Sequence, residues 1–185
     1  MIKFIAKIFL YLKNKIEIMK NNLFYGAKGR KSKIIKPMRI IGKRFICIGD
    51  SVHILNDARI EAISEYAGVK LSPKLVIGDR TTIEQNCHII AASELIIGSD
   101  CMFSAFVYIA DCNHQFISGI RVHDAELKVQ KTTIGNGVFI GIGARIMPGV
   151  RLGNNCVVGA NAVVTHDVPD RAVVAGIPAK IIKYI

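Results

Sequence analysis

The sequence predicts an all-β protein whose main body is a parallel β-helix of short repeats. An aliphatic residue recurs at every sixth position through six consecutive units from residue 134. The same pattern appears upstream in three blocks, which start at residues 48, 77 and 97 and hold three units each. A period of six fits neither a 3.6-residue helix nor a two-residue alternation. It suits a short strand followed by a tight turn, repeated.

The hexads have similar residue types at the same positions. The leading aliphatic residue is expected to point into the core, and the fifth residue is small because it also packs towards the interior. Gly or Asn at the second position can adopt the backbone conformation that the tight turn at the corner needs. Three units make one triangular coil, and coils stack about 4.8 Å apart with backbone hydrogen bonds between them. The leading residues of the C-terminal run are Ile134, Ile140, Ile146, Leu152, Val158 and Val164.

The five cysteines are an odd number and lack the Cys-x-x-Cys spacing of metal sites. They therefore indicate neither a disulfide framework nor a metal ligand set, and they fit a reducing compartment. Cys87, Cys101 and Cys156 all occupy the small fifth position of their units. We expect these three to pack in the core.

The net charge of +11 is concentrated near the start of the chain, because residues 1–45 contain 13 of the 25 Lys and Arg and a single acidic residue. The remainder is close to neutral and has no basic stripe with interleaved aromatic residues, which argues against nucleic acid as a partner. The apolar stretch at residues 4–12 is far shorter than the roughly 20 residues that a bilayer span needs. We expect a cytoplasmic protein.

Residues 1–40 are expected to form a basic segment with a short amphipathic helix, and residues 41–185 the β-helix domain. Apolar residues in the first segment recur at spacings of three and four, with the lysines largely off that stripe. One interpretation is a cap over the open end of the β-helix. The other is attachment to an anionic membrane surface, which would make the protein membrane-peripheral.

Breaks in the repeat must leave the solenoid as loops. Two are short or moderate, at residues 66–76 and 95–96, and the longest, at residues 115–131, directly follows the unit that ends at His114. This longest insertion is the candidate active-site loop. The segment beyond it returns to hexads, which end in a tail at residues 169–185.

The run IADCNH before the long loop, and the ending VVGANAVVTHDVPDRAVVAGIPAKIIK with its Gly-x-Pro-Ala-Lys tail, resemble the hexapeptide-repeat acyltransferases. Within that family the sequence resembles the sugar O-acetyltransferase branch, which includes the maltose and galactoside enzymes. It covers roughly residues 41–185 and implies a left-handed β-helix, acetyl-CoA as the acyl donor, and a homotrimer with sites shared between neighbouring chains.

The resemblance implies that His114 is the general base, because it ends the unit before the large loop. An alcohol must lose its proton as it attacks a thioester, and imidazole titrates near neutral pH. Without the repeat context His114 would be interpreted as a solvated loop residue. The resemblance also assigns polar contacts with the acceptor to Glu84 and Asn86. Asp111 and Asn113 flank His114 and either bind the acceptor or satisfy backbone groups at the corner.

For coenzyme A, the resemblance places the pantetheine arm along the last coils and the phosphates at the basic tail. The backbone N–H of Ile142 is a candidate donor to the developing oxyanion. The residues assigned to this site are Ile142, Ala160, Thr165, His166, Lys180 and Lys183.

These observations favour an O-acetyltransferase that acts on a carbohydrate hydroxyl, with surface polysaccharide as the expected acceptor and no metal. Two alternatives use the same fold. One is a xenobiotic, antibiotic or amino-sugar acetyltransferase. The other is a trimeric carbonic anhydrase-like enzyme, for which His88, His114 and His123 would be the zinc ligands, although they lack the close histidine pair expected there.

Overall fold

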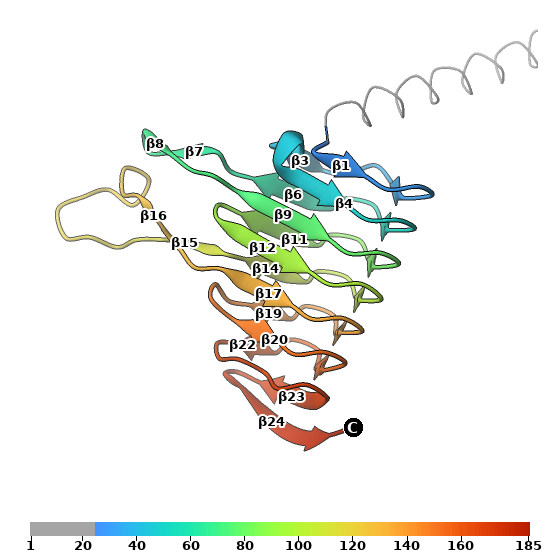
Figure 1. Ribbon diagram of the computed structural model, residues 1–185. Helices are drawn as coiled ribbons and strands as arrows, with labels where there is room; N and C mark the ends of the chain where they lie inside the picture. The colour runs from blue at the N-terminus through green and yellow to red at the C-terminus, as the bar shows by residue number, and fades with distance from the viewer. Residues whose placement is uncertain (1–24) are drawn as a thin grey trace, which may run out of the picture.

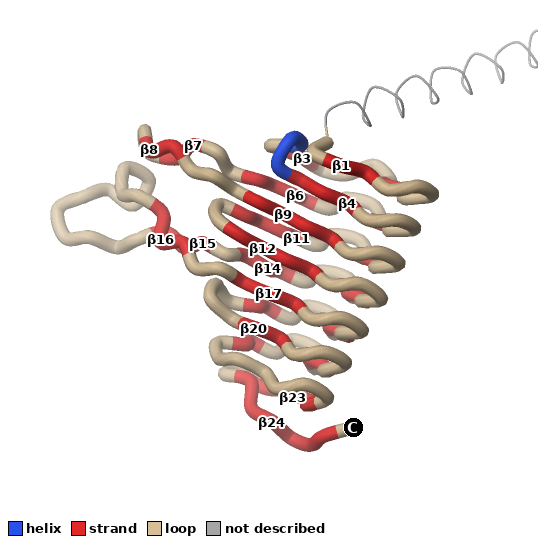
Figure 2. Tube along the Cα trace, viewed as in Figure 1, coloured by secondary structure: helices blue, strands red, loops and turns tan. Residues whose placement is uncertain are grey.

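A computed structural model describes residues 25–185, and the predicted N-terminal helix lies outside them. The described chain is a triangular prism of stacked coils (Figure 1), which confirms the predicted left-handed parallel β-helix. Three parallel sheets form its faces, and short turns join them at the corners (Figure 2). No helix in the described part of the chain is long and apolar enough to cross a membrane.

Each face stacks parallel strands from successive coils, and the second face ends with the antiparallel strand β24. The first face is made of β1 (Ala27–Lys28), β4 (Ile46–Ile48), β9 (Lys74–Ile77), β12 (Glu94–Ile97), β17 (Thr132–Ile134) and β20 (Arg151–Leu152). The second face is made of β2 (Lys33–Ile34), β5 (His53–Ile54), β10 (Thr82–Ile83), β13 (Met102–Phe103), β18 (Phe139–Ile140), β21 (Val157–Val158), β23 (Ala172–Gly176) and β24 (Ala179–Tyr184). The third face is made of β3 (Arg39–Ile41), β6 (Arg59–Ala62), β11 (His88–Ala91), β14 (Tyr108–Ala110), β19 (Arg145–Ile146) and β22 (Val163–Val164).

The leading residues of the hexads stack in register inside the prism. On the first face the strand pairing aligns Ile48, Ile77, Ile97, Ile134 and Leu152 in one column. Every member is at most 3% exposed. Each column removes aliphatic side chains from water on several coils at once, so the hydrophobic effect stabilises the stack as a whole.

The three cysteines predicted to pack in the core are buried, as expected. Two of them also link neighbouring coils, because the Cys87 thiol donates to the carbonyl of Ser104 at 3.2 Å and the Cys101 thiol to the carbonyl of Gly135 at 3.1 Å. Burial raises the pKa of the Cys87 thiol to about 11. These thiols are therefore neutral packing groups.

The prism begins earlier than residue 41. Strands β1, β2 and β3 pair in parallel with β4, β5 and β6 and form a coil that lies almost entirely within the segment 1–40, which was expected to precede the β-helix. The short 3-10 helix η1 (Lys43–Phe45) connects this coil to the next. The hexad continues into this coil, because Ile34 and Ile40 align with Ile54 and Ile60 of the next coil. Its first unit is hard to recognise because Lys28 occupies the leading position, opposite Ile48.

The corner between the first and second faces is held by close backbone packing and a ladder of side-chain caps. A Cβ atom at Gly98 would lie 2.5 Å from the carbonyl oxygen of Gly135 on the next coil, so glycine is required sterically. The Asn136 side chain accepts from the backbone amide of Ser99, and Asn154 in turn accepts from that of Asn136. Each cap satisfies a turn amide of the preceding coil.

Two hairpins leave the prism from the same corner, beyond the ends of β6 and β14 on the third face (Figure 1). The shorter pairs β7 (Glu65–Tyr66) with β8 (Val69–Lys70), and the longer pairs β15 (Cys112–His114) with β16 (Leu127–Val129). The predicted 115–131 insertion is thus a hairpin whose strand β16 occupies part of it, with residues 115–126 as its loop.

Candidate functional site

A cavity of about 240 Å³ lies on the outer side of the third face, next to both hairpins. Its apolar and aromatic walls surround a few charged and polar groups, which is the composition typical of small-molecule sites. The residues that line it are Arg59, Glu61, Ile63, Tyr66, Ile90, Tyr108, Cys112, Asn113, His114 and Leu127. We call this cavity the His114 pocket.

His114 is the last residue of strand β15, where the chain enters the long loop. Its side chain is exposed, and its Nδ1 atom lies 3.1 Å from the hydroxyl oxygen of Tyr66. The two rings are also in contact, with centroids 5.4 Å apart and planes inclined by 57°. His114 is therefore accessible to a substrate and held through one ring nitrogen.

An arginine–glutamate pair lies in the same pocket. The Glu61 side chain is only 3% exposed, and its Oε2 atom accepts from Nη2 of Arg59 at 2.7 Å. Arg39 approaches Oε1 of the same carboxylate at 3.3 Å, without a well-aligned hydrogen bond. Hydrogen bonding to Glu61 raises the pKa of Arg59, with burial acting in the opposite direction. Glu61 Oε1 and Arg59 Nε are both buried without a hydrogen-bond partner.

Cys112 also lines the pocket but is not suited to covalent catalysis. Its side chain is buried, and burial raises the pKa of the thiol to about 12, with the nearby charge of Asp111 adding to the effect. A nucleophilic cysteine needs a lowered pKa. Cys112 is therefore a packing residue of the pocket wall.

Asp111 and Asn113, which flank His114, have different surroundings. Asn113 is exposed and lines the pocket, and its contact with the acceptor stays a prediction. Asp111 is fully buried, and its two carboxylate oxygens accept from the backbone amides of Ala92 and Ser93 at 2.7 and 2.8 Å. The structure therefore favours the second of the two roles considered for Asp111, that of a corner residue satisfying backbone groups.

Glu84 and Asn86 lie at the corner between the second and third faces, outside the His114 pocket of their own chain. Glu84 accepts a hydrogen bond from the backbone amide of Ala105 at 3.1 Å. Asn86 has a left-handed φ of 58°, which the turn requires and Asn tolerates. Both residues have structural roles here, and one chain does not bring them to His114.

Two of the residues assigned to coenzyme A, Ile142 and Ala160, lie one above the other at the same corner. Ile142 and Ala160 occupy equivalent turn positions on adjacent coils, and Asn161 N donates to the carbonyl of Ile142 at 2.8 Å. Within residues 25–185, the backbone N–H groups of Ile142 and Ala160 have no acceptor. Two amides are thus available to a ligand that lies along this corner.

The remaining coenzyme A residues lie nearer the C-terminus. Thr165 and His166 are exposed beyond β22, with the Thr165 hydroxyl 2.9 Å from His166 Nδ1. Lys180 and Lys183 are exposed on β24, which pairs antiparallel with β23. The two lysines thus present positive charge at the narrow end of the prism (Figure 1).

The two halves of the predicted site are separated within one chain. His114 follows the carboxyl end of β14, whereas Ile142 precedes the amino end of β19, which pairs with β14 in parallel. They therefore lie beyond opposite ends of the third-face strands. A catalytic centre with both requires either a ligand that spans the face or a second chain.

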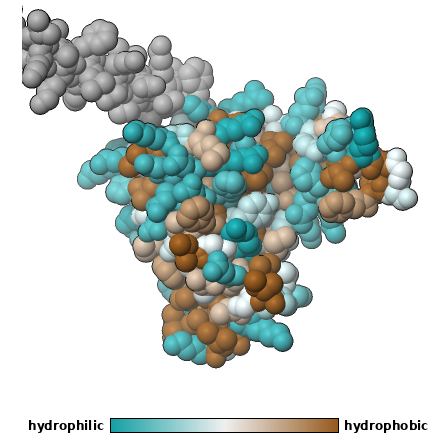
Figure 3. All heavy atoms as spheres, turned by 180° about the vertical axis from the view of Figure 1, so that it is seen from behind, coloured by the Kyte–Doolittle hydropathy of each residue, from teal (hydrophilic) through white to brown (hydrophobic). Residues whose placement is uncertain are grey.

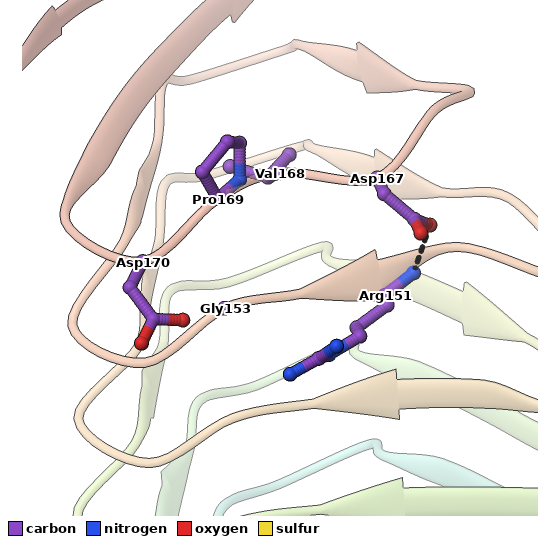
Figure 4. A pocket seen from close by; sticks show the side chains of 6 residues that line it. All are labelled: Arg151, Gly153, Asp167, Val168, Pro169 and Asp170. Carbon is purple, nitrogen blue, oxygen red and sulfur yellow. Dashed lines mark hydrogen bonds between the residues drawn. The ribbon is translucent and has the colours of Figure 1, made fainter.

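A second depression of about 210 Å³ lies near the C-terminal end (Figure 4). Asp167 accepts from the backbone amide of Arg151 at 2.8 Å, and Asp170 accepts from that of Asn154 at 2.8 Å. These carboxylates cap turns, so the depression is explained by corner geometry. No three His, Cys, Asp or Glu side chains in the described part of the chain gather as a metal site.

Four residues that line the pocket are not among those predicted from the sequence, namely Arg59, Glu61, Tyr66 and Tyr108. A usable signal was present for Tyr66, because the breaks at residues 66–76 and 115–131 both follow the third unit of a coil. Insertions at equivalent phases leave the prism at the same corner and become neighbours. Nothing in the hexad singled out Arg59, Glu61 or Tyr108, which occupy ordinary outward positions.

The comparisons with known proteins agree with this architecture. Residues 131–166 match the family model for "Bacterial transferase hexapeptide (six repeats)". Over 155 residues the chain is 31% identical to the Escherichia coli protein named "Putative lipopolysaccharide biosynthesis O-acetyl transferase WbbJ", covering 76% of each chain. It is also 34% identical over 100 residues to the galactoside O-acetyltransferase of Escherichia coli, which is 54% of this chain and 49% of that enzyme.

Among solved structures, the hexapeptide-repeat acetyltransferase VCA0836 of Vibrio cholerae, crystallised with acetyl coenzyme A, has a TM-score of 0.65 and 22% identity. The match covers 92% of this chain and 77% of that one, and it establishes the shared fold. With the hexads, the prism and the extended identity to WbbJ, the chain belongs to the hexapeptide-repeat acyltransferase family, in the branch that contains the sugar O-acetyltransferases.

Proposed function

We propose that this protein transfers an acetyl group from acetyl-CoA to a hydroxyl of a carbohydrate, with His114 as the general base. The observation that carries the proposal is the His114 pocket, in which an exposed imidazole faces a cavity walled by Tyr66, Tyr108 and aliphatic side chains. Such walls suit the apolar face of a sugar ring. The names of the relatives, O-acetyltransferases of lipopolysaccharide biosynthesis and of galactosides, support the same substrate class.

The chemistry needs no covalent enzyme intermediate. Nε2 of His114 removes the hydroxyl proton as the oxygen attacks the thioester carbonyl, and the C–S bond then breaks. The imidazolium returns the proton to the sulfur, so CoA leaves as the thiol. The free backbone N–H of Ile142 is the proposed donor to the oxyanion, a role that does not depend on its side chain.

We further propose a homotrimer in which the corner with Ile142 and Ala160 on one prism faces the His114 pocket of its neighbour. The separation of these groups within one chain supports this arrangement, and so does the exposed apolar surface. Apolar side chains on the long loop project into solvent (Figure 3), namely Phe116, Ile117, Ile120 and Val122. Lys180 and Lys183 would then bind the phosphates of CoA, beside Thr165 and His166.

The acceptor that fits best is a residue of a surface polysaccharide, built in the cytoplasm and linked to lipid. The first coil supports a peripheral contact with an anionic membrane surface, because its exposed side chains include Arg30, Lys31, Lys33 and Lys36. Each basic residue near such a surface contributes about 1 kcal/mol. Sedimentation with vesicles that contain anionic lipid, but not with neutral vesicles, is the expected result; equal binding to both would contradict it.

The central test is acetyl-CoA consumption over a panel of sugars and oligosaccharides. His114→Ala should lower turnover by roughly two to four orders of magnitude without changing the oligomeric state. His53→Ala is the matched control, because His53 is exposed on the second face, away from the pocket. Near-normal turnover of the His114 variant would contradict the proposed mechanism.

A further inference from the structure

We propose that Tyr66 is a positioning residue that holds the His114 imidazole in the orientation and tautomer of a base acting through Nε2. The inference rests on the proposed function for its catalytic consequence, but the orientation and tautomer can be measured without any reaction. Tyr66 lies 48 residues before His114, on the other hairpin.

Two contacts restrain the imidazole. The Tyr66 hydroxyl lies 3.1 Å from Nδ1, and the aromatic ring packs against the imidazole at an inclination of 57°. The hydrogen bond selects which way the ring faces, and the ring contact limits its rotation. Within residues 25–185, Tyr66 is the only hydrogen-bond partner of the His114 side chain, and no carboxylate forms an ion pair with it.

The backbone of the β7–β8 hairpin holds Tyr66 in a fixed position. Tyr66 pairs with Val69 across a two-residue turn, in which Ala67 and Gly68 both have positive φ, at 50° and 75°. Two positive φ angles are characteristic of the tight hairpin turn that matches strand twist. The amide of Leu71 donates to the carbonyl of Ser64 at 2.9 Å and closes the base of the hairpin.

The direction of the hydrogen bond between Tyr66 and His114 determines whether Nε2 of His114 can act as the base. In a neutral imidazole one nitrogen carries the proton and the other has the lone pair. When Nδ1–H donates to the phenol oxygen, the lone pair is on Nε2 and can accept the proton of the acceptor hydroxyl. The resulting imidazolium carries protons on both nitrogens, so its bond to Tyr66 becomes charge-assisted and strengthens as the reaction proceeds.

The experiment compares Tyr66→Phe with the wild-type full-length protein. Phenylalanine keeps the ring contact and removes the hydroxyl. We expect kcat to fall about tenfold, as for the loss of one hydrogen bond, with the KM of both substrates unchanged within about twofold. Tyr25→Phe on the first coil is the matched control and should leave kcat unchanged.

The second measurement is the nitrogen NMR spectrum of histidine-labelled protein, with the His114 signals identified by their loss in His114→Gln. The wild type should show the Nδ1–H tautomer, and Tyr66→Phe a mixture with Nε2–H. An unchanged tautomer together with an unchanged kcat would overturn the proposal. So would a rise in acceptor KM at constant kcat, because it would make Tyr66 a substrate contact. Should the wild type acetylate no carbohydrate, the proposed function fails, while the tautomer shift still decides the role of Tyr66.

Discussion

The carboxylate of Asp111 is fully buried and accepts a hydrogen bond of 2.7 Å from the backbone amide of Ala92, one coil away. Its other oxygen accepts from the amide of Ser93, so the side chain ties the corner of one coil to the strand that carries His114. The chain leaves the prism for the long hairpin directly after Asp111 and returns at Gln130, whose amide donates to the Asp111 carbonyl at 2.7 Å.

Asp111→Asn should destabilise the protein. The amide can accept one of the two backbone hydrogen bonds, but its NH₂ group faces the other N–H, which is left buried without a partner. We expect a loss of about 1–3 kcal/mol in the free energy of unfolding, measured by chemical denaturation. Asp57→Asn, at an exposed turn position, is the control and should be within about 0.5 kcal/mol of wild type. Equal stability of the two variants would contradict this role.

Gly98→Ala should be poorly tolerated for steric reasons. The added methyl group would lie 2.5 Å from the Gly135 carbonyl oxygen, and the backbone of the next coil cannot yield without disturbing its own hydrogen bonds. Overpacking of this kind costs about 1–3 kcal/mol. Ser104→Ala, at the equivalent hexad position of the next corner on the same coil, should be nearly neutral. Thermal unfolding measures the melting temperatures of both variants. A lowered melting temperature for Gly98→Ala alone indicates a steric requirement at that corner, and equal losses in both would contradict it.

His88 should make stability depend on pH. Burial, followed by the positive charges of Arg59 and Arg145, holds the pKa of His88 below its ordinary value. The unfolded chain therefore binds a proton at this site at higher pH than the folded chain does. The contribution of neutral His88 is fully present above about pH 6.5 and is lost as the pH falls towards the lower folded-state pKa.

His88→Gln removes this titration, so its stability should decline less than that of wild type between about pH 7 and pH 5. Denaturation midpoints at several pH values measure the difference. His53→Gln serves as the control, since His53 lies on the neighbouring face. Parallel pH profiles for wild type and His88→Gln would show that the site does not titrate differently on folding.

Glu61→Gln should weaken acceptor binding. The Glu61 carboxylate is buried in the pocket with one oxygen lacking a hydrogen bond, and beside it Arg59 Nε is an unpaired donor. The ion pair with Glu61 holds the guanidinium of Arg59 at the wall of the pocket, where it can meet an acceptor hydroxyl. We expect the acceptor KM to rise about tenfold, as for loss of a hydrogen bond to a charged group, with the KM for acetyl-CoA unchanged.

Glu94→Gln is the matched control for that substitution, because Glu94 forms its ion pairs with Lys74 and Lys131 outside the pocket. Kinetics with varied acceptor and saturating acetyl-CoA separate the two constants. An acceptor KM that is unchanged in Glu61→Gln would assign the arginine–glutamate pair to structure alone.

The extent to which the sequence predicts the site varies from residue to residue. His114 stands at a break in a regular pattern, where the resemblance to the hexapeptide-repeat enzymes places a general base, and Asn113 is singled out by its place beside it. Asp111 was ambiguous, since a carboxylate at a corner can face solvent or backbone, and only the fold shows both oxygens bonded to amides. Glu84 shares its hexad position with other outward residues, so its hydrogen bond to the Ala105 amide could not be anticipated.

The sequence by itself determined the prism. A hexad is local information, and every repetition places aliphatic side chains in the same column, so burial of apolar surface leaves one consistent arrangement. The tertiary structure decided what surrounds His114. Tyr66 reaches it from a hairpin 48 residues away, and Arg59 and Glu61 come from two coils above the strand that leads to it. Contacts between non-repeating segments depend on turn geometry and on which corner each insertion leaves, and neither is encoded in the period of six.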